Sequence, residues 1–143
     1  MDFHIKPYEG LGNIALGMTK ETIQHMFGEK TKDFKRGNES VPSDFIKEFL
    51  LFVYYSDNGY CNAIELCEPT NTYFKGKNVI GVPYNWVKSF VEQHDANLEC
   101  NEYGFTSLKF GFGVYVHDLD EGDEPVNSVI VFEKGYYNWL NLN

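Results

Sequence analysis

The chain has 143 residues, of which 21 are acidic and 12 are lysine or arginine, and its formal net charge is −9. That length is typical of one domain with one hydrophobic core, and an apolar content of 43% is too high for a disordered chain. The negative charge disfavours DNA, RNA and anionic membranes as partners. No apolar run reaches the roughly 18 residues of a transmembrane helix, and no secretory signal is recognisable at the start. We therefore expect a cytoplasmic single domain over residues 1–143, monomeric by default.

The clearest local pattern predicts a helix over about 19–27. Thr19 is suited to cap its N-terminus, and Glu21 lies in the first turn, where the helix dipole favours negative charge. Met18 and Ile23 have the spacing of a hydrophobic staple, and Gly28 suits a left-handed C-terminal cap. The side chains expected to face a sheet are Ile23, Met26 and Phe27.

Short strands surround this helix. We expect a strand over 3–8, a turn at 10–12 and a short helical turn at 45–46. The run FLLFVYY at 49–55 is typical of a central strand covered on both faces. Asn58-Gly59 then predicts a tight hairpin, because both residues tolerate positive φ.

A second helix is predicted over about 83–95, starting at Pro83, which is tolerated in a first turn. A spacing of four residues places Val82, Trp86, Phe90 and His94 on one broad apolar face, with Val87 and Val91 beside them. Strands are expected to follow at 98–102, 105–110, 112–117 and 126–133. These elements predict an α+β fold of mainly antiparallel sheet with two packing helices.

The two halves of the chain, about 13–75 and 80–135, are similar to each other. Leu16-Gly17-Met18-Thr19 opens the first helix and Ile80-Gly81-Val82-Pro83 opens the second, at a constant offset of 64 positions. Each helix is followed by a charged strand, an apolar strand and an acidic turn. We interpret this as a duplicated unit of a helix and a β-meander, in which neither half buries its helix face alone.

The residues that could carry catalysis are sparse, so we predict no catalytic residue, no metal and no cofactor. None of the four histidines lies in a metal-binding spacing, and phosphate-loop and serine-nucleophile motifs are missing. His117 beside Asp118 is the best candidate for acid–base chemistry. The cysteines at 61, 67 and 100 have no zinc or redox spacing and are expected to be reduced and mostly buried.

An acidic loop at 118–124 and an aromatic tail are the most distinctive segments. The loop resembles a fragment of a calcium site, but the distal ligand position falls on Val129. We interpret it as a solvated loop whose carboxylates contact lysine or arginine on a partner and speed association. Tyr136, Tyr137 and Trp139 either pack back onto the sheet or anchor an interface.

Several segments together resemble a family of small bacterial proteins that includes immunity proteins of polymorphic or contact-dependent growth inhibition toxin systems. The segments are Pro7-Tyr8-Glu9-Gly10, Leu16-Gly17-Met18-Thr19, Gly104-Phe105-Thr106-Ser107, Val114-Tyr115 and residues 129–137. The resemblance implies a cytoplasmic protein without enzymatic activity, whose partner is the C-terminal domain of one cognate toxin. It transfers no binding residue, and residues 29–48 have no counterpart in it.

Together, charge and resemblance predict an immunity protein that masks a basic, nuclease-type toxin domain stoichiometrically. The predicted toxin-binding residues are Asp118, Asp120, Glu121, Asp123 and Glu124, followed by Asp57 and Tyr60. The alternative is a small-ligand or regulatory binding module without catalytic activity that uses an aromatic face of the sheet, with a pocket lined by Tyr and Phe. Two further hypotheses are less favoured by the sequence. One is an enzyme that uses His117, and the other is a protein that binds single-stranded nucleic acid, which would need a basic groove.

Overall fold

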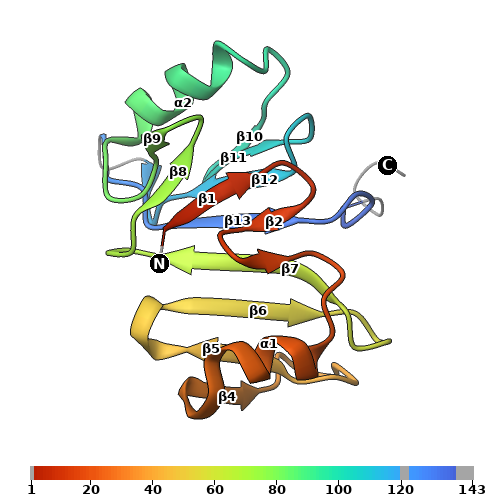
Figure 1. Ribbon diagram of the computed structural model, residues 1–143. Helices are drawn as coiled ribbons and strands as arrows, with labels where there is room; N and C mark the ends of the chain where they lie inside the picture. Colours follow the sequence, from red (N-terminus) through yellow and green to blue (C-terminus); the bar gives the residue numbers. More distant parts are fainter. Residues whose placement is uncertain (1, 120–122, 138–143) are drawn as a thin grey trace.

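A computed structural model describes residues 2–119 and 123–137 of the chain. These residues form an eight-stranded sheet, and Figure 1 shows the helices and a smaller sheet in front of it. The strand order of the large sheet is β10-β11-β12-β13-β7-β6-β5-β4, and every neighbouring pair is antiparallel. Its strands are β4 (Thr31–Phe34), β5 (Ser43–Ile46), β6 (Leu51–Tyr55), β7 (Cys61–Cys67), β10 (Glu99–Asn101), β11 (Gly104–Ser107), β12 (Phe112–Tyr115) and β13 (Ser128–Phe132). The β7–β13 pair lies at the centre of the sheet. It joins two meanders of four consecutive strands each, β4 to β7 and β10 to β13.

The second layer consists of the helices and a five-stranded sheet of order β3-β2-β1-β8-β9. Its elements are β1 (Phe3–Lys6), β2 (Gly10–Leu11), β3 (Ile14–Ala15), β8 (Thr72–Phe74), β9 (Lys77–Asn78), α1 (Lys20–Phe27) and α2 (Tyr84–Glu92). The parallel pairing of β1 with β8 joins the N-terminal strands to the segment that leads into α2. The chain is thus an α+β protein with extensive antiparallel sheet; the division into duplicated halves stays an interpretation.

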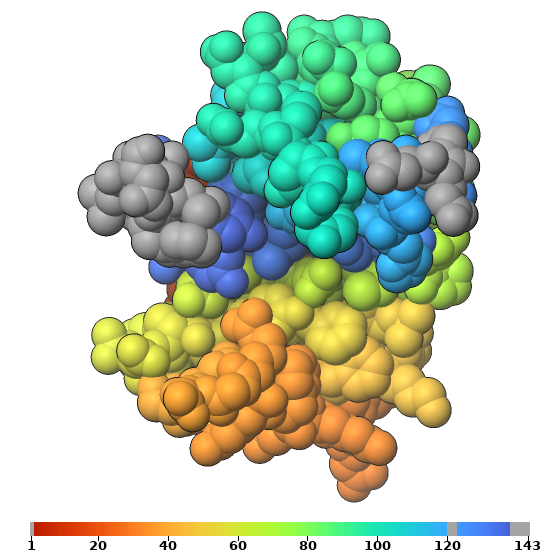
Figure 2. Space-filling view, turned by 180° about the vertical axis from the view of Figure 1, so that it is seen from behind, coloured from red at the N-terminus to blue at the C-terminus, as the bar shows by residue number. Residues whose placement is uncertain are grey.

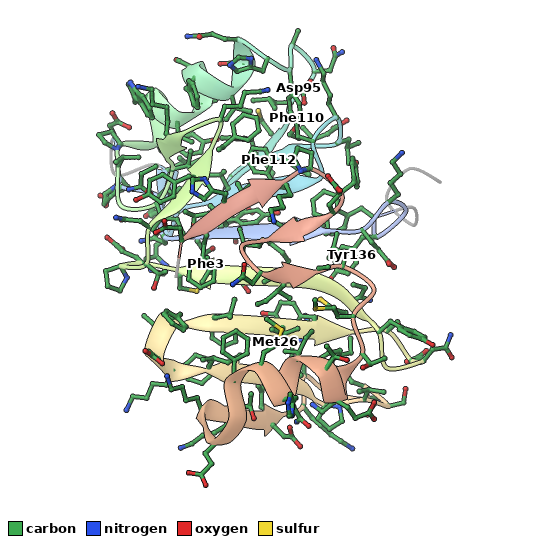
Figure 3. All side chains as sticks on the ribbon, viewed as in Figure 1. Phe3, Met26, Asp95, Phe110, Phe112 and Tyr136 are labelled. Carbon is green, nitrogen blue, oxygen red and sulfur yellow. The ribbon has the colours of Figure 1, made fainter. Side chains whose placement is uncertain are left out.

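The hydrophobic core fills the space between the two layers. Phe3 and Phe112 lie there (Figure 3), and neither has exposed surface. The rings of Phe74 and Phe112 pack 4.8 Å apart. Along β13, Val129 and Val131 face this core, whereas the alternate residues belong to a separate apolar cluster on the other face of the sheet.

The predicted first helix is confirmed. Thr19 Oγ1 accepts a hydrogen bond from the Thr22 amide at 3.2 Å, and the helix ends at Phe27 before Gly28, whose φ is 58°. The prediction that Met26 faces the sheet is wrong, because its side chain is 39% exposed. The buried contact of this helix is made by Ile23 and Phe27.

The predicted second helix is right at its start and wrong at its end. It ends at Glu92 rather than at 95, and the amides of His94 and Asp95 both bond to the Val91 carbonyl in a closing turn. Its buried residues are Tyr84, Val87 and Val91. Val87 and Val91 belong to the predicted apolar face, whereas Trp86 is a correction: it is 46% exposed and stacks on Phe90 at 5.3 Å, at the edge of that face.

Three local predictions in the N-terminal half are also wrong. Residues 45–46 form part of β5 instead of a helical turn, because β4 and β6 pair with both edges of that segment. Residues 10–11 form strand β2 between β1 and β3 rather than a turn. The run 49–55 becomes strand only from Leu51, since Leu50 adopts a left-handed conformation with φ of 50°.

Candidate functional site

The face of the large sheet opposite the core carries an aromatic cluster, and we call it the open face. Its buried members are Tyr54, Ala63, Ile130 and Phe132, and the half-buried residues packed against them include Phe34, Phe52, Tyr115, Tyr136 and Tyr137. Figure 2 looks onto this face, whose middle is formed by side chains of β6, β7 and β13 in gold, yellow-green and blue. Both helices lie on the other side of the sheet (Figure 1).

Charged groups hold the aromatic side chains of β6 in place. The Tyr54 hydroxyl donates a hydrogen bond to Glu65 Oε1 at 2.6 Å, and the guanidinium of Arg36 lies 3.7 Å from the centre of the Tyr54 ring. Burial, reinforced by the charge of Glu65, raises the pKa of Tyr54 far above its ordinary value. The phenol therefore stays protonated at neutral pH and keeps donating. Phe52 packs beside Tyr54, with ring centres 6.5 Å apart.

The aromatic tail packs back onto the open face in its described part. Phe132 stacks with Tyr136 at 5.9 Å and meets Tyr137 edge-on at 4.9 Å. Figure 3 shows Tyr136 at the end of β13. Trp139, the third aromatic residue singled out in the tail, lies outside the described residues. Tyr136 and Tyr137 are thus part of the packing of this face.

A polar cavity of about 310 Å³ lies at the start of β13. It is lined by Glu65, Cys67, Glu68, His117, Asn127 and Ser128. Asn127 organises it, because its Oδ1 accepts a hydrogen bond from the His117 amide at 2.6 Å and its Nδ2 donates to Glu68 Oε2 at 3.2 Å. His117, the sequence candidate for acid–base chemistry, thus lies beside two carboxyl side chains.

The thiol in this cavity is not activated. Burial, followed by the charge of Glu65, raises the pKa of Cys67 to about 11, so it is almost entirely protonated at neutral pH. Within residues 2–119 and 123–137, no three His, Cys, Asp or Glu side chains are grouped as metal ligands. The cavity is chemically suited to accept a hydrogen-bond donor or a cation from a partner.

The three cysteines differ in environment, which predicts their order of alkylation. Cys100 is exposed, contrary to the expectation of mostly buried thiols, Cys67 is half-buried and Cys61 is buried. Because the pKa of Cys67 is about 11 against an ordinary 9.0, its thiolate fraction at pH 8 falls about 100-fold. Mass spectrometry after iodoacetamide treatment should show Cys100 modified first and Cys61 last. Equal rates at Cys67 and Cys100 in the folded protein would contradict this order.

The residues predicted to bind a toxin are divided between two ends of the sheet. Strand β7 is antiparallel to both β6 and β13. The turn with Asp57 and Tyr60, which follows β6, therefore lies where β13 ends, whereas the acidic loop lies where β13 begins. Asp120 and Glu121 lie outside the described residues. Asp118 and Asp123 are exposed and Glu124 is half-buried, and Tyr60 is 49% exposed.

Part of the acidic loop caps helix α2. The N-cap residue Pro83 makes no side-chain cap, and Asp123 Oδ1 instead accepts a hydrogen bond from the Asn85 amide at 2.8 Å. The Glu124 carbonyl accepts from the Tyr84 amide at 2.9 Å. A carboxylate at this helix end satisfies a backbone donor and complements the helix dipole. Asp123 therefore has a structural role that its place in a charged loop did not reveal.

Replacing Asp123 with alanine should lower the free energy of unfolding by about 1 kcal/mol, the usual cost of losing an N-terminal cap. Urea unfolding followed by circular dichroism measures it. Asp57→Ala is the matched control, because Asp57 is an exposed loop carboxylate that accepts a hydrogen bond from the Ser40 hydroxyl at 2.7 Å and caps no helix of the described residues. Its expected loss is below about 0.5 kcal/mol. Equal losses for the two variants would refute the capping role.

Sequence reasoning invoked an aromatic sheet face for the alternative, small-ligand function, but it did not identify the residues of the open face. Tyr54 and Phe52 were assigned to a strand covered on both sides, and Arg36 and Glu65 were not singled out. An unbroken apolar run looks the same whether its second face is covered by the fold or left for a partner. The sequence signal closest to an open face lies in strand β7, beside β6. There the polar residues Asn62 and Glu65 interrupt an otherwise apolar strand.

Comparisons with known proteins add no assignment. No family model, curated protein or solved structure matches this chain. Among the described residues, neither helix has the length and apolar character needed to cross a membrane. The geometry of the open face is therefore the basis for a functional proposal.

Proposed function

We propose that this chain is an immunity protein that acts in the cytoplasm by binding the C-terminal domain of one cognate bacterial toxin and blocking it stoichiometrically. The observation that carries the proposal is the open face: an eight-stranded sheet with an aromatic centre held by Arg36 and Glu65 and an acidic cavity beside it. Tight protein interfaces have this composition, with buried aromatic anchors inside a polar rim.

The charge of the chain specifies the class of partner. With a net charge of −9, it attracts a cationic surface and repels polyanions. A nuclease-type toxin has such a surface, because its substrate is a polyanion. In the proposed complex, Phe52 and Tyr54 lie at the centre of the interface. Glu65 and Glu68 accept hydrogen bonds from a lysine or arginine side chain of the toxin.

Inhibition by masking requires no chemical step from this chain. The Cys67 thiol in the acidic cavity, whose pKa burial raises to about 11, offers a toxin a neutral side chain beside the two glutamates. Association should be fast at low ionic strength and slower with added salt, because charge steering acts on the encounter rate.

Co-expression with the toxin C-terminal domain encoded beside this gene tests the proposal. We expect growth to be restored, a one-to-one complex on size-exclusion chromatography, and loss of toxin activity at equimolar ratio. A non-cognate toxin domain of similar isoelectric point is the control for nonspecific charge attraction and should be neither bound nor inhibited. Absence of binding and protection with the cognate domain, or turnover of the toxin by catalytic amounts of this chain, would overturn the proposal.

A further inference from the structure

A second cavity, of about 410 Å³, lies at the opposite end of β13 from the acidic cavity, and it shares Phe132, Tyr136 and Tyr137 with the open face. The function proposed above assigns it no ligand. Its walls are the aromatic residues Tyr8, Phe132, Tyr136 and Tyr137 and the cations Lys109 and Lys134; the remaining described lining residues are a leucine and a glycine. The volume is in the range of small-molecule sites, which combine apolar walls with a few polar groups.

The charge of this cavity is opposite to that of the protein as a whole. None of the described residues that line it is acidic, although the chain carries 21 acidic residues. Neither Lys109 nor Lys134 takes part in an ion pair of the described residues. Lys109 Nζ donates to the His94 carbonyl at 2.6 Å, which occupies one of the three donors of an ammonium group. The same Lys109 ammonium lies 5.1 Å from the centre of the Phe110 ring, outside the cavity walls, whereas Lys134 Nζ lies 5.6 Å from the centre of the Tyr8 ring in the wall. The ammonium group of Lys134 is therefore the one suited to bind an anion in this cavity.

The tyrosines contribute neutral aromatic walls. The Tyr8 hydroxyl donates to the Leu108 carbonyl, so that polar group is already satisfied. Burial raises the pKa of Tyr8, Tyr136 and Tyr137, so none of them adds negative charge at neutral pH. The Phe132 ring meets those of Tyr8, Tyr136 and Tyr137 at centre distances of 6.1, 5.9 and 4.9 Å.

The position of Tyr8 is set by a glycine. A Cβ atom at Gly111 would lie 2.8 Å from the Tyr8 ring, so a larger residue would collide with this ring. The φ of Gly111 is 72°, a backbone conformation that also favours glycine. Lys134 Nζ lies 5.6 Å from the centre of the same ring. The Tyr8 wall of the cavity is therefore held by packing against Gly111 and Lys134.

We propose that this cavity binds a small planar aromatic molecule that carries one anionic group, a carboxylate, sulfonate or phosphate. The ring packs against Tyr8, Phe132 and the tail tyrosines, and the anion is bound by Lys134. Ring and anion are both required, because neither surface stacking nor an exposed ammonium alone retains a small ligand.

Isothermal titration of the whole chain with 2-naphthoate tests the site. We expect saturable binding at one site per chain, with affinity for the uncharged 2-naphthamide lower by at least about tenfold. Acetate, which lacks the ring, and 2-naphthylmethylammonium, which reverses the charge, should not bind measurably. No saturable binding of 2-naphthoate, or equal binding of the amide, would refute the proposal.

Two variants locate the site. Lys134→Met should weaken 2-naphthoate binding by about tenfold with an unchanged thermal unfolding midpoint, because Lys134 is exposed. Lys77→Met removes the same charge from exposed strand β9 and should leave the affinity within about twofold. Equal effects of the two substitutions would show that net charge, and not this cavity, is responsible for binding.

Discussion

Replacing Asp44 with alanine is expected to lower the free energy of unfolding by about 3 kcal/mol. Asp44 is fully buried beneath α1, where it accepts hydrogen bonds from Tyr55 at 2.6 Å, Lys20 at 3.1 Å and Gln24 at 3.2 Å. Without it, the Tyr55 hydroxyl loses its acceptor in the core. Lys20 keeps Asp33 at 3.2 Å and the Pro42 carbonyl at 2.8 Å, which holds the cost at the lower end of the range for breaking a buried ion pair.

An exposed ion pair of the same chain provides the control. Lys30 pairs with Glu48, and their side chains are 59% and 46% exposed, so Glu48→Ala should cost less than about 1 kcal/mol. Asp44→Asn, which retains an acceptor, should lie between the two in urea unfolding. If Asp44→Ala and Glu48→Ala cost the same, the buried network does not stabilise the fold as described.

Replacing Phe52 with alanine should weaken toxin binding by about 30-fold or more, as expected for a central aromatic anchor. Phe52 is half-buried on the open face, beside Tyr54 and 4.7 Å from Phe45 between ring centres. Glu68→Lys, which leaves the aromatic cluster intact, should mainly slow association and change its salt dependence. Surface plasmon resonance with the cognate toxin domain measures both effects, at a temperature where circular dichroism shows both variants folded.

Trp86→Ala is the matched control for the open face. Trp86 is 46% exposed on α2, in the layer that covers the other face of the sheet. Its loss should change toxin affinity by less than about twofold. The opposite result, with Trp86→Ala weakening binding and Phe52→Ala having no effect, would move the interface to the helix layer while leaving the immunity function intact.

Local elements were predictable where their determinants are close in sequence. The first helix follows from Thr19, Ile23 and Gly28, because a cap, a staple and a left-handed stop act over one turn. Strand β5 was missed because its partners, β4 and β6, pair with it from outside the segment. The end of α2 at Glu92 was missed for a related reason, since the adjoining Asp95 bonds to Ser107 of β11 at 2.7 Å.

The candidate site divides in the same way. Sequence alone identified the carboxylates of loop 118–124, but the hydrogen bond from the distant Asn85 amide assigns Asp123 to the helix cap. The ring of Tyr8 lies against Gly111, where a Cβ atom would come within 2.8 Å of it. Both contacts join residues more than 30 positions apart, beyond the reach of spacing arguments.

Composition and short-range pattern determined the negative charge of this protein, the class of partner it repels and the start of both helices, because these properties belong to single residues or single turns. Only the tertiary structure decided which face of the large sheet is covered. In an antiparallel sheet, alternate residues point to opposite faces, and β6 and β13 carry apolar side chains on both. The helices and the small sheet pack on one of these faces, and the other displays its aromatic residues.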